Sequence, residues 1–481
     1  MTNRVDNAVV RSTVERVWDD AVLTSLAEFV SIPALSPIFD ANWAASGHLD
    51  AAVEHVRRWL VGRGIEGATA EVLRLPGKSP VLLFEVPPTG EVRADADTVL
   101  LYGHLDKQPP VGGWSEGLGP WTPVLRDGRL YGRGAADDGY SGYAAAAAIE
   151  ALREAGGSHA RCVLLLETSE ESGSPDLAAY LERYADKLGA VSLVVCLDSG
   201  GQDYDRLWLT TSLRGLVSTT VTVKVLASGQ HSGSASGIVP SSFRIMRQLL
   251  DRLEDSATGE VLLAEMHGEV PPERLAEIKS MAELAPGAAA QAFPLLEGMS
   301  AASDDDVELM LNNSWRPTLS VIGGAGFPPP EEAGNVLRTE TTFTLSFRLP
   351  PTASPPAALA ALEKALTTDV PYGAHVTLSR TEEGPGWNAP PLAPWLQSTL
   401  DSLSETVFGG NPWLTIRLGG SIPFMGSRSL ADMYPEAQFV VTGALSSDSN
   451  PHVPDEWLNI PHAKRITESV AHILAAHAAR P

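Results

Sequence analysis

The feature of this sequence that most restricts the fold is an alternation of apolar runs with helical segments over its first 200 residues. Strands are predicted at 98–106, 161–167 and 191–197, because each is a short apolar run that ends in polar residues. Helices are predicted between them, at 141–155 and 176–188. Strands that alternate with helices form largely parallel, mixed sheets flanked by helices, so this part of the chain is predicted to be an α/β domain.

The pattern changes near residue 213. From there the sequence predicts a strand, a helix, two strands, a helix and a strand, at 216–226, 240–254, 317–322, 336–349, 355–367 and 373–381. This order is that of a ferredoxin-like α+β sandwich with an insertion. The α/β pattern then returns, with strands at 414–417 and 438–442 that are expected to complete the first sheet.

These changes predict a domain organisation. We expect a catalytic domain in two parts, residues 1–212 and 386–481, interrupted by an inserted lid or dimerisation domain at 213–385. A chain of 481 residues exceeds the usual size of a single core, which agrees with more than one domain.

Composition excludes several classes of protein. The formal net charge of −24 argues against a nucleic-acid-binding surface. No apolar run is long enough to cross a membrane, and the first 20 residues lack the apolar core of a signal peptide, so no membrane partner and a cytoplasmic location are expected. The two cysteines, Cys162 and Cys196, lie in apolar strand-like runs and are expected to be buried thiols rather than zinc ligands.

Ionisable residues gather where the predicted strands end. They are His104, Asp106, Asp137, Glu170, Glu171 and Asp198. In open α/β sheets the loops at the carboxyl ends of the strands meet in one crevice, where ligands bind. We therefore expect these side chains to share one site. His159, His267, His375, His462, His472 and His477 have no such setting and are expected at the surface.

The residue types favour a pair of metal ions. Zinc in hydrolases binds imidazole and carboxylate groups and keeps one position open for water. The available ligands are His104, Asp137, Glu171, Asp198 and His452. Three carboxylates and one hydroxide would balance two divalent cations, which makes the cluster neutral. Asp106, two residues after His104, is suited to accept the second N–H of that imidazole.

Five segments together resemble one family. They are LLYGHLDKQP, LYGRGAADDG, ETSEESGSP, CLDSG and SDSNPHVPDEWL, and they resemble the motifs of the di-zinc metallopeptidases that include carnosinase, carboxypeptidase G, dipeptidase PepV and the aminoacylases. The resemblance covers nearly the whole chain. It implies that His104 and Asp198 bind one metal, that Glu171 and His452 bind the other, and that Asp137 bridges them. It also implies a cis peptide bond between Asp137 and Asp138.

The resemblance and the chemistry together suggest catalytic roles. Glu170, beside a metal ligand without being one, is placed to take a proton from water and pass it to the leaving amine. His231, in the segment GQHSG, is the candidate donor to the oxyanion. In relatives the equivalent histidine often reaches the site from a partner subunit, which implies a homodimer. The residues before His231 depart from the usual family pattern of Asp-Leu/Val-His-Ser-Gly.

Substrate-binding candidates follow from the same resemblance. Arginine forms paired hydrogen bonds with carboxylates, and SFRLP and RLGGSIP resemble the carboxylate-binding segments of the family. Arg348, Arg417 and Ser421 are therefore expected to bind substrate, together with Asn335. After Asp138 relatives often carry Lys-Gly, whereas this chain has Gly139-Tyr140, and Tyr140 is expected to alter the pocket.

The function predicted from the sequence is hydrolysis of the amide bond of a dipeptide or N-acyl amino acid that has a free carboxylate. A metal-bridging hydroxide is the expected nucleophile, with Glu170 as general base. Two divalent ions are expected, most simply Zn²⁺, with Co²⁺ or Mn²⁺ as alternatives. Two other functions stay open: a deacylase that acts on a non-peptide amide, and a non-catalytic metal-stabilised binding protein of the same fold. Glu170 argues against the second, because a scaffold needs no base beside a ligand.

Overall fold

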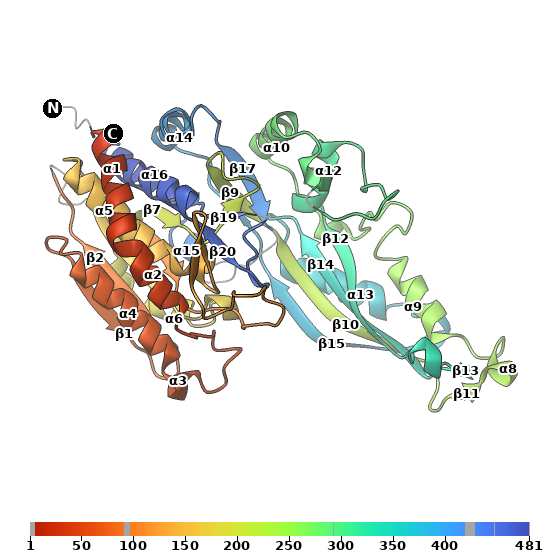
Figure 1. Cartoon of the computed structure of the whole chain (residues 1–481). Coiled ribbons are helices and arrows are strands. Elements are labelled where there is room, and N and C mark those ends of the chain that lie inside the picture. Colours follow the sequence, from red (N-terminus) through yellow and green to blue (C-terminus); the bar gives the residue numbers. More distant parts are fainter. Residues whose placement is uncertain (1–4, 91–96, 292, 419–428, 447, 481) are drawn as a thin grey trace. The chain divides into compact units, whose positions relative to one another are not determined.

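The computed structural model of the chain describes residues 5–90, 97–291, 293–418, 429–446 and 448–480. The chain divides into two compact units, which Figure 1 shows with their elements labelled. Unit 1 comprises Met1–Thr211, Ala389–Ile416 and Ser421–Pro481, and unit 2 comprises Ser212–Asn388 and Arg417–Gly420.

Unit 1 is built on a six-stranded sheet with the strand order β1-β2-β6-β3-β7-β18. The strands are β1 (Thr69–Leu73), β2 (Val81–Val86), β6 (Arg161–Glu167), β3 (Thr98–His104), β7 (Val191–Cys196) and β18 (Gln438–Val441). The pairs β6–β3, β3–β7 and β7–β18 are parallel, whereas β1–β2 and β2–β6 are antiparallel. The predicted α/β class with a mixed, largely parallel sheet is confirmed.

The central strands are apolar along most of their length because both faces of the sheet are covered. Every residue of β3 is buried, as expected of parallel strands that lie between helices. Helices α5 (Ser141–Glu154), α1 (Asn7–Val17) and α16 (Ile460–Ala479) pack against one another, and α5 also contacts β3 and β6. The five consecutive alanines of α5 are all buried, which lets the helix lie close to its neighbours.

The remaining elements of unit 1 are short or lie at its margins. Its other helices are α2 (Leu23–Val30), α3 (Trp43–Ser46), α4 (His48–Gly62), α6 (Leu177–Arg183), α7 (Ala185–Leu188), α14 (Pro394–Thr406) and α15 (Leu430–Met433). Two small sheets carry loops of the site: β4 (Val124–Arg126), β5 (Arg129–Tyr131) and β20 (Trp457–Asn459) form one, and β8 (Gly200–Gly201) and β19 (Leu445–Ser446) form the other.

Unit 2 is a four-stranded antiparallel sheet with the order β12-β14-β10-β15. Along the chain its elements are β10 (Gly215–Lys224), α9 (Ser242–Leu250), β12 (Thr318–Ala325), β14 (Glu340–Leu349), α13 (Pro355–Thr367) and β15 (His375–Gly384). This βαββαβ sequence is the ferredoxin-like arrangement. The insertion between α9 and β12 forms α10 (Pro272–Leu284), α11 (Ala288–Gln291) and α12 (Asp306–Ser314).

One hydrophobic core lies between that sheet and its two helices. Val217 and Val221 of β10 alternate with more exposed residues, as a strand with one covered face requires. They share the core with Phe347 of β14, Leu249 of α9 and Leu362 of α13. Unit 2 therefore has a core of its own, separate from the core of unit 1.

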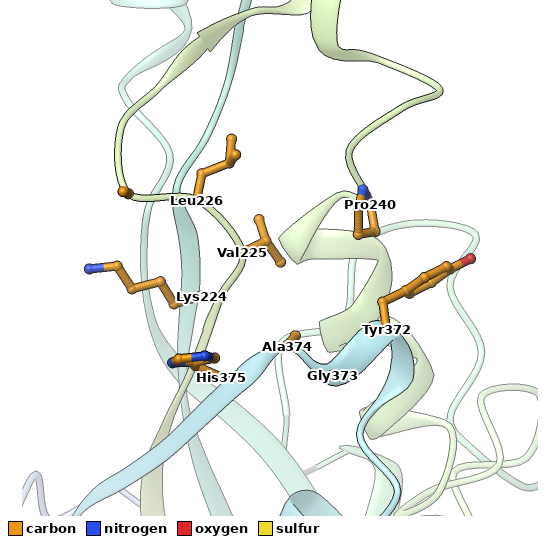
Figure 2. A pocket seen from close by; sticks show the side chains of 9 residues that line it. Lys224, Val225, Leu226, Pro240, Tyr372, Gly373, Ala374 and His375 are labelled. Atoms are coloured by element: carbon orange, nitrogen blue, oxygen red, sulfur yellow. The ribbon is translucent and has the colours of Figure 1, made fainter.

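Unit 2 also has a cavity of about 460 Å³ at one end of β10 and β15. Figure 2 shows Lys224 and His375 close together, with Tyr372 on the opposite side of the cavity. The lining contains no aspartate or glutamate, and Lys224 is exposed and lies 3.7 Å from Glu340. The cavity therefore offers no carboxylate ligands for a divalent cation.

Helix α1 begins at Asn7, where Asp6 caps it by accepting the N–H groups of Ala8 and Val9, and a π-helical turn at Trp18–Val22 separates α1 from α2. One strand is placed differently from the prediction. The strand predicted at 414–417 is β17 (Leu414–Leu418). It joins a small sheet with β9 (Trp208–Leu213) and β16 (Trp387–Asn388) instead of the six-stranded sheet.

The expectation that the remaining histidines lie at the surface is wrong for three of them. His159, His462 and His477 are buried, whereas His267 and His375 are exposed. The imidazole of His462 packs against Phe408 and Tyr204, and Nδ1 lies 3.1 Å from the carbonyl oxygen of Tyr204. The sequence around His462 did not indicate that this imidazole is buried.

No helix among the described residues is both long and apolar enough to cross a membrane.

The buried histidines predict a loss of stability in mild acid. Burial lowers the pKa of His462 to about 4, from an ordinary value of 6.5. Between pH 6.5 and pH 4 the unfolded chain therefore binds a proton that the folded chain does not, and the free energy of unfolding falls as the pH falls. We expect His462→Asn to flatten this fall by roughly 3 kcal/mol.

The measurement is urea unfolding in EDTA at several values of pH from 7 to 4. His48→Asn serves as the control, because the side chain of His48 is exposed and its loss is expected to leave the slope unchanged. If the free energy of unfolding has the same pH dependence in His462→Asn and in the parent chain, the lowered pKa of His462 is contradicted.

Candidate metal centre

Three adjacent parallel strands of unit 1 bring polar side chains to one edge of the sheet. His104 is the last residue of β3, Glu170 and Glu171 lie in a 3₁₀ turn after β6, and Asp198 follows β7. Because β6, β3 and β7 are neighbours with the same direction, their carboxyl ends meet. This topology is the reason that these side chains lie at one edge of the sheet.

Two further side chains reach the same edge on loops. Asp137 lies in the tight turn Ala135–Gly139, which follows β5, and His452 lies on the loop after β19. The peptide bond between Asp137 and Asp138 is cis, as the resemblance implied.

The first group of candidate ligands is His104, Asp137 and Asp198, and all three are buried. His104 Nε2 lies 3.3 Å from Asp137 Oδ1 and 3.7 Å from Asp198 Oδ2. Their ligand atoms lie within 4.8 Å of one another, which is close enough for one ion to contact all three.

The second group is Asp137, Glu171 and His452. His452 Nε2 lies 2.9 Å from Asp137 Oδ2 and 3.3 Å from Glu171 Oε2. Asp137 thus directs one oxygen to each group. A carboxylate in this position can be shared by two ions, as in binuclear hydrolases.

The electrostatics of this edge call for positive charge. Burial, followed by the negative charge of Asp198, raises the pKa of Glu170 well above its ordinary value. Burial also raises the pKa of Asp198 far above the usual range. Burial acts in the same direction on Asp137, but hydrogen bonds with His104 and His452 outweigh it and lower the pKa of that carboxyl. Divalent cations would keep all three carboxylates ionised.

The donor set fits a pair of divalent cations. Glu171 Oε1 is buried and has no hydrogen-bond partner, although its partner oxygen Oε2 has two. A buried carboxylate oxygen without a partner is costly, and a cation is the group that would satisfy it. Imidazole nitrogens and carboxylate oxygens are also the ligands that zinc prefers.

Asp106 has a wider role than the one expected from the sequence. His104 Nδ1 lies 3.1 Å from the backbone oxygen of Asp106 and 3.5 Å from its Oδ1. The carboxylate also accepts the backbone N–H groups of Glu170 and Glu171, at 3.2 and 3.0 Å. Asp106 therefore orients the imidazole and holds the turn that presents Glu170 and Glu171.

Two supporting side chains were missed by the sequence reasoning. Glu167 is fully buried and accepts hydrogen bonds from Tyr102, Ser169 and Ser174, which fixes the base of the loop that carries Glu170. Gln108 donates from Nε2 to Glu171 Oε2 at 2.6 Å. Both lie inside segments that were recognised as motifs, but their residue types alone did not indicate these contacts.

Lys107 is a third residue of this kind. Its ammonium group is fully buried and donates to the carbonyl oxygens of Phe29, Val30 and Ile32, at the end of α2. It therefore caps α2 and attaches that helix to the loop that follows His104.

Tyr140 does not alter the pocket in the way expected. Its ring is fully buried, and its hydroxyl donates to the carbonyl oxygen of Leu197 and accepts the N–H of Ala444. It thereby holds the segment before Asp198, because Leu197 precedes that residue. Close packing continues at Gly103, where a Cβ would lie 2.7 Å from Asp138 Oδ2.

The candidates in unit 2 fall at two different ends of its sheet. His231 is exposed and pairs with Val336 through the short strands β11 (Gln230–His231) and β13 (Val336–Leu337). The carbonyl oxygen of Asn335 accepts the N–H of Ser232, which places Asn335 beside His231. Arg348 is half-buried near the other end of β14.

Arg348 has a cationic neighbour. Arg214 lies close enough to have its pKa lowered to about 10, mainly by burial and then by the charge of Arg348. Arg417 lies in β17, and its side chain, like the whole of Ser421, falls outside the described residues.

Comparison with known proteins identifies the family. The sequence profile of peptidase family M20/M25/M40 matches residues 100–476, which is most of the chain. The chain belongs to this peptidase family. The M20 family is the one that the sequence motifs resembled, so that prediction is confirmed.

Individual relatives agree with the family assignment. The chain is 25% identical over 437 residues to a cysteinylglycine-S-conjugate dipeptidase of Corynebacterium striatum, which covers 88% of this chain and 90% of the relative. It is 27% identical over 425 residues to the mouse Beta-Ala-His dipeptidase, covering 84% and 82% of the two chains. The crystal structure of human carnosine dipeptidase 1 has the same fold, with a TM-score of 0.72, 22% identity and coverage of 98% and 99%.

The centre predicts that metal stabilises the folded protein. Removal of divalent ions with EDTA is expected to lower the unfolding temperature, because it leaves buried carboxylates without a compensating charge. Adding Zn²⁺ at 100 times its dissociation constant is expected to restore about 2.7 kcal/mol for each site. Differential scanning calorimetry with and without the ion measures this.

Asp137→Asn is expected to lose most of the zinc-dependent increase, because Asp137 belongs to both groups of ligands. The control is Asp176→Asn, which removes a carboxylate that pairs with Lys78 and belongs to neither group of candidate ligands, and it is expected to keep the increase. A full zinc-dependent increase in Asp137→Asn would contradict the shared-ligand arrangement.

Proposed function

We propose that this protein is a metal-dependent dipeptidase that hydrolyses the amide bond of a dipeptide with a free carboxylate. The observation that carries the proposal is the shared position of Asp137, with one oxygen directed at each of two groups of candidate ligands. The printed names of two relatives, a cysteinylglycine-S-conjugate dipeptidase and a Beta-Ala-His dipeptidase, support the substrate class.

The proposed centre holds two divalent ions, with Zn²⁺ as the first choice for the donor set. His104 and Asp198 would hold one ion, Glu171 and His452 the other, and Asp137 both. When bound, the ions would lower the pKa of water and polarise the substrate carbonyl. The protein's own task is to hold these five side chains in register and to move the proton.

Glu170 is proposed as the group that moves the proton. Its carboxylate is buried at the edge of the cluster, with Oε2 4.0 Å from His104 Nε2, and it belongs to neither group of candidate ligands. A raised pKa suits a base that must release its proton again to the leaving amine. Asp106 holds this carboxylate in place through the backbone of its turn.

The geometry of unit 2 supports a homodimer. Arg348 is eight residues from Glu340 along β14, which is about 26 Å at 3.3 Å per residue, and His231 lies beyond the Glu340 end. An extended dipeptide spans about 7 Å. If His231 and Arg348 both contact one dipeptide, they come from different chains, so we propose that His231 acts in the site of a partner subunit.

Arg348, Arg417, Ser421 and Asn335 are proposed to bind the substrate, with the arginines on its carboxylate. The cytoplasm is proposed as the location, because Cys162 and Cys196 are both buried free thiols, as is usual in a reducing compartment.

The first test is Glu170→Gln. The amide cannot accept the proton of water, so kcat is expected to fall at least about 100-fold while zinc binding is retained. The measurements are dipeptide hydrolysis and metal content of the purified protein. Glu182→Gln, at an exposed position of α6, is the matched control and is expected to keep full turnover. Undiminished turnover in Glu170→Gln would exclude this residue as the base.

The second test asks from which chain His231 acts. Glu170→Gln and His231→Ala are each expected to be nearly inactive, and the two proteins are mixed under conditions that exchange subunits. If His231 acts in the partner's site, a mixed dimer has one intact site. If the two proteins are combined in equal amounts, half of the dimers are mixed at equilibrium and each has one intact site of two, so about one quarter of the parent activity is expected to return. No recovery after verified exchange would show that His231 acts within its own chain or not at all.

A further inference from the structure

A buried ion pair links the two loops that carry Asp137 and His452. Arg133 Nη1 donates to Glu456 Oε2 at 2.7 Å, and the two side chains are 1% and 0% exposed. Neither residue belongs to the candidate ligands. Burying two charges costs several kcal/mol for each ion before their attraction is counted, so such a pair is not explained by stability alone.

The second oxygen of Glu456 binds the Asp137 loop. Oε1 accepts the backbone N–H groups of Gly134, Ala136 and Asp137, at 2.9, 3.2 and 3.3 Å. These amides lie in the tight turn between β5 and α5, and all three residues are buried. One carboxylate oxygen therefore satisfies three donors and fixes the backbone from which Asp137 projects.

The second nitrogen of Arg133 binds the His452 loop. Nη2 donates to the carbonyl oxygen of Val453 at 3.1 Å, one residue after His452. His452 has a left-handed backbone with φ of 64°, and its side chain is 55% exposed, so few other contacts hold it. Arg133 therefore binds the backbone beside His452 and also pairs with Glu456, and Glu456 binds the backbone N–H of Asp137.

The other candidate ligands are held by different means. His104 is part of the central strand β3. Asp198 follows β7 and forms a β-bridge with Gly443. Glu171 is held by Asp106 through its N–H and by Gln108 through its carboxylate. Among the described candidate ligands, His452 has the least support from regular structure.

We propose that Arg133 and Glu456 are positioning residues that set the separation of Asp137 from His452, and so complete the second metal position. The pair binds neither metal nor substrate. The inference rests on the proposed function in one respect, namely that Asp137, Glu171 and His452 bind an ion. It predicts that the two metal positions respond differently. Loss of the contacts of Arg133 is expected to lower the affinity for the ion beside His452 and to leave the affinity for the ion beside His104 unchanged.

The test is Arg133→Met, which keeps most of the side-chain volume and removes both donors. Stepwise Zn²⁺ binding to the folded, EDTA-stripped protein is measured by calorimetry, with Arg133→Lys and His452→Ala in parallel. In Arg133→Met one binding step is expected to stay within a factor of about three and the other to weaken about 10- to 100-fold, which is the usual effect of losing an outer-shell partner. His452→Ala is expected to weaken the same step further, and Arg133→Lys to weaken it less than Arg133→Met.

The matched control is Arg63→Met, which breaks an ion pair of 2.7 Å with Glu150 in the same unit, and neither residue belongs to the candidate ligands. It is expected to lower the unfolding temperature in EDTA without changing either zinc-binding step. If Arg133→Met behaves as Arg63→Met does, the pair is only structural and the inference is overturned.

Additional variants keep the test decisive when Arg133→Met alone does not answer it. If Arg133→Met does not fold, Arg133→Met/Glu456→Gln removes both buried charges together, and the same selective weakening of one step is expected. If His452→Ala binds two zinc ions as tightly as the parent chain, the proposed metal centre itself is wrong and the inference fails with it. Weakening by His452→Ala but not by either Arg133 variant would refute the positioning role alone.

Discussion

The crowding of buried negative charge at the carboxyl edge of the unit 1 sheet is the constraint on which the rest of the site depends. Asp137, Glu170 and Asp198 lie within a few ångströms of one imidazole, and all are nearly inaccessible to water. Such a group is stable as anions only with compensating cations. The fold brings these side chains to one edge of the sheet, and their negative charges favour the binding of cations there.

Four acidic residues around the site, Asp106, Glu167, Glu171 and Glu456, differ in their hydrogen-bond partners. Asp106 and Glu456 accept backbone N–H groups from the loops that carry the candidate ligands, and Glu167 accepts three side-chain hydroxyls below one of these loops. Their lone pairs are therefore already used. Glu171 instead has an oxygen that meets no donor. That oxygen of Glu171 is therefore available to an ion.

The sequence could predict the α/β class and the residues that gather at the sheet edge, because both depend on periodic patterns and on where strands end. It could not predict Arg133 and Glu456 as a pair, because they are 323 residues apart and their contact exists only after both loops fold. It misplaced His462, since burial of one imidazole depends on which aromatic rings surround it. It also assigned Tyr140 to the pocket, whereas the ring points into the core and its hydroxyl holds two backbone groups. Local sequence patterns thus identified the candidate ligands, whereas the residues that hold them in place depend on tertiary contacts.

The two groups of candidate ligands differ in how firmly the fold holds them. His104 lies on a fully buried strand, and Asp198 follows another, so their positions are set by the hydrogen bonds of the sheet. His452 lies on a half-exposed loop, and the buried guanidinium of Arg133 binds that loop one residue later. The buried pair of Arg133 and Glu456 thus connects the loop of His452 to the turn of Asp137, the carboxylate that belongs to both groups of candidate ligands.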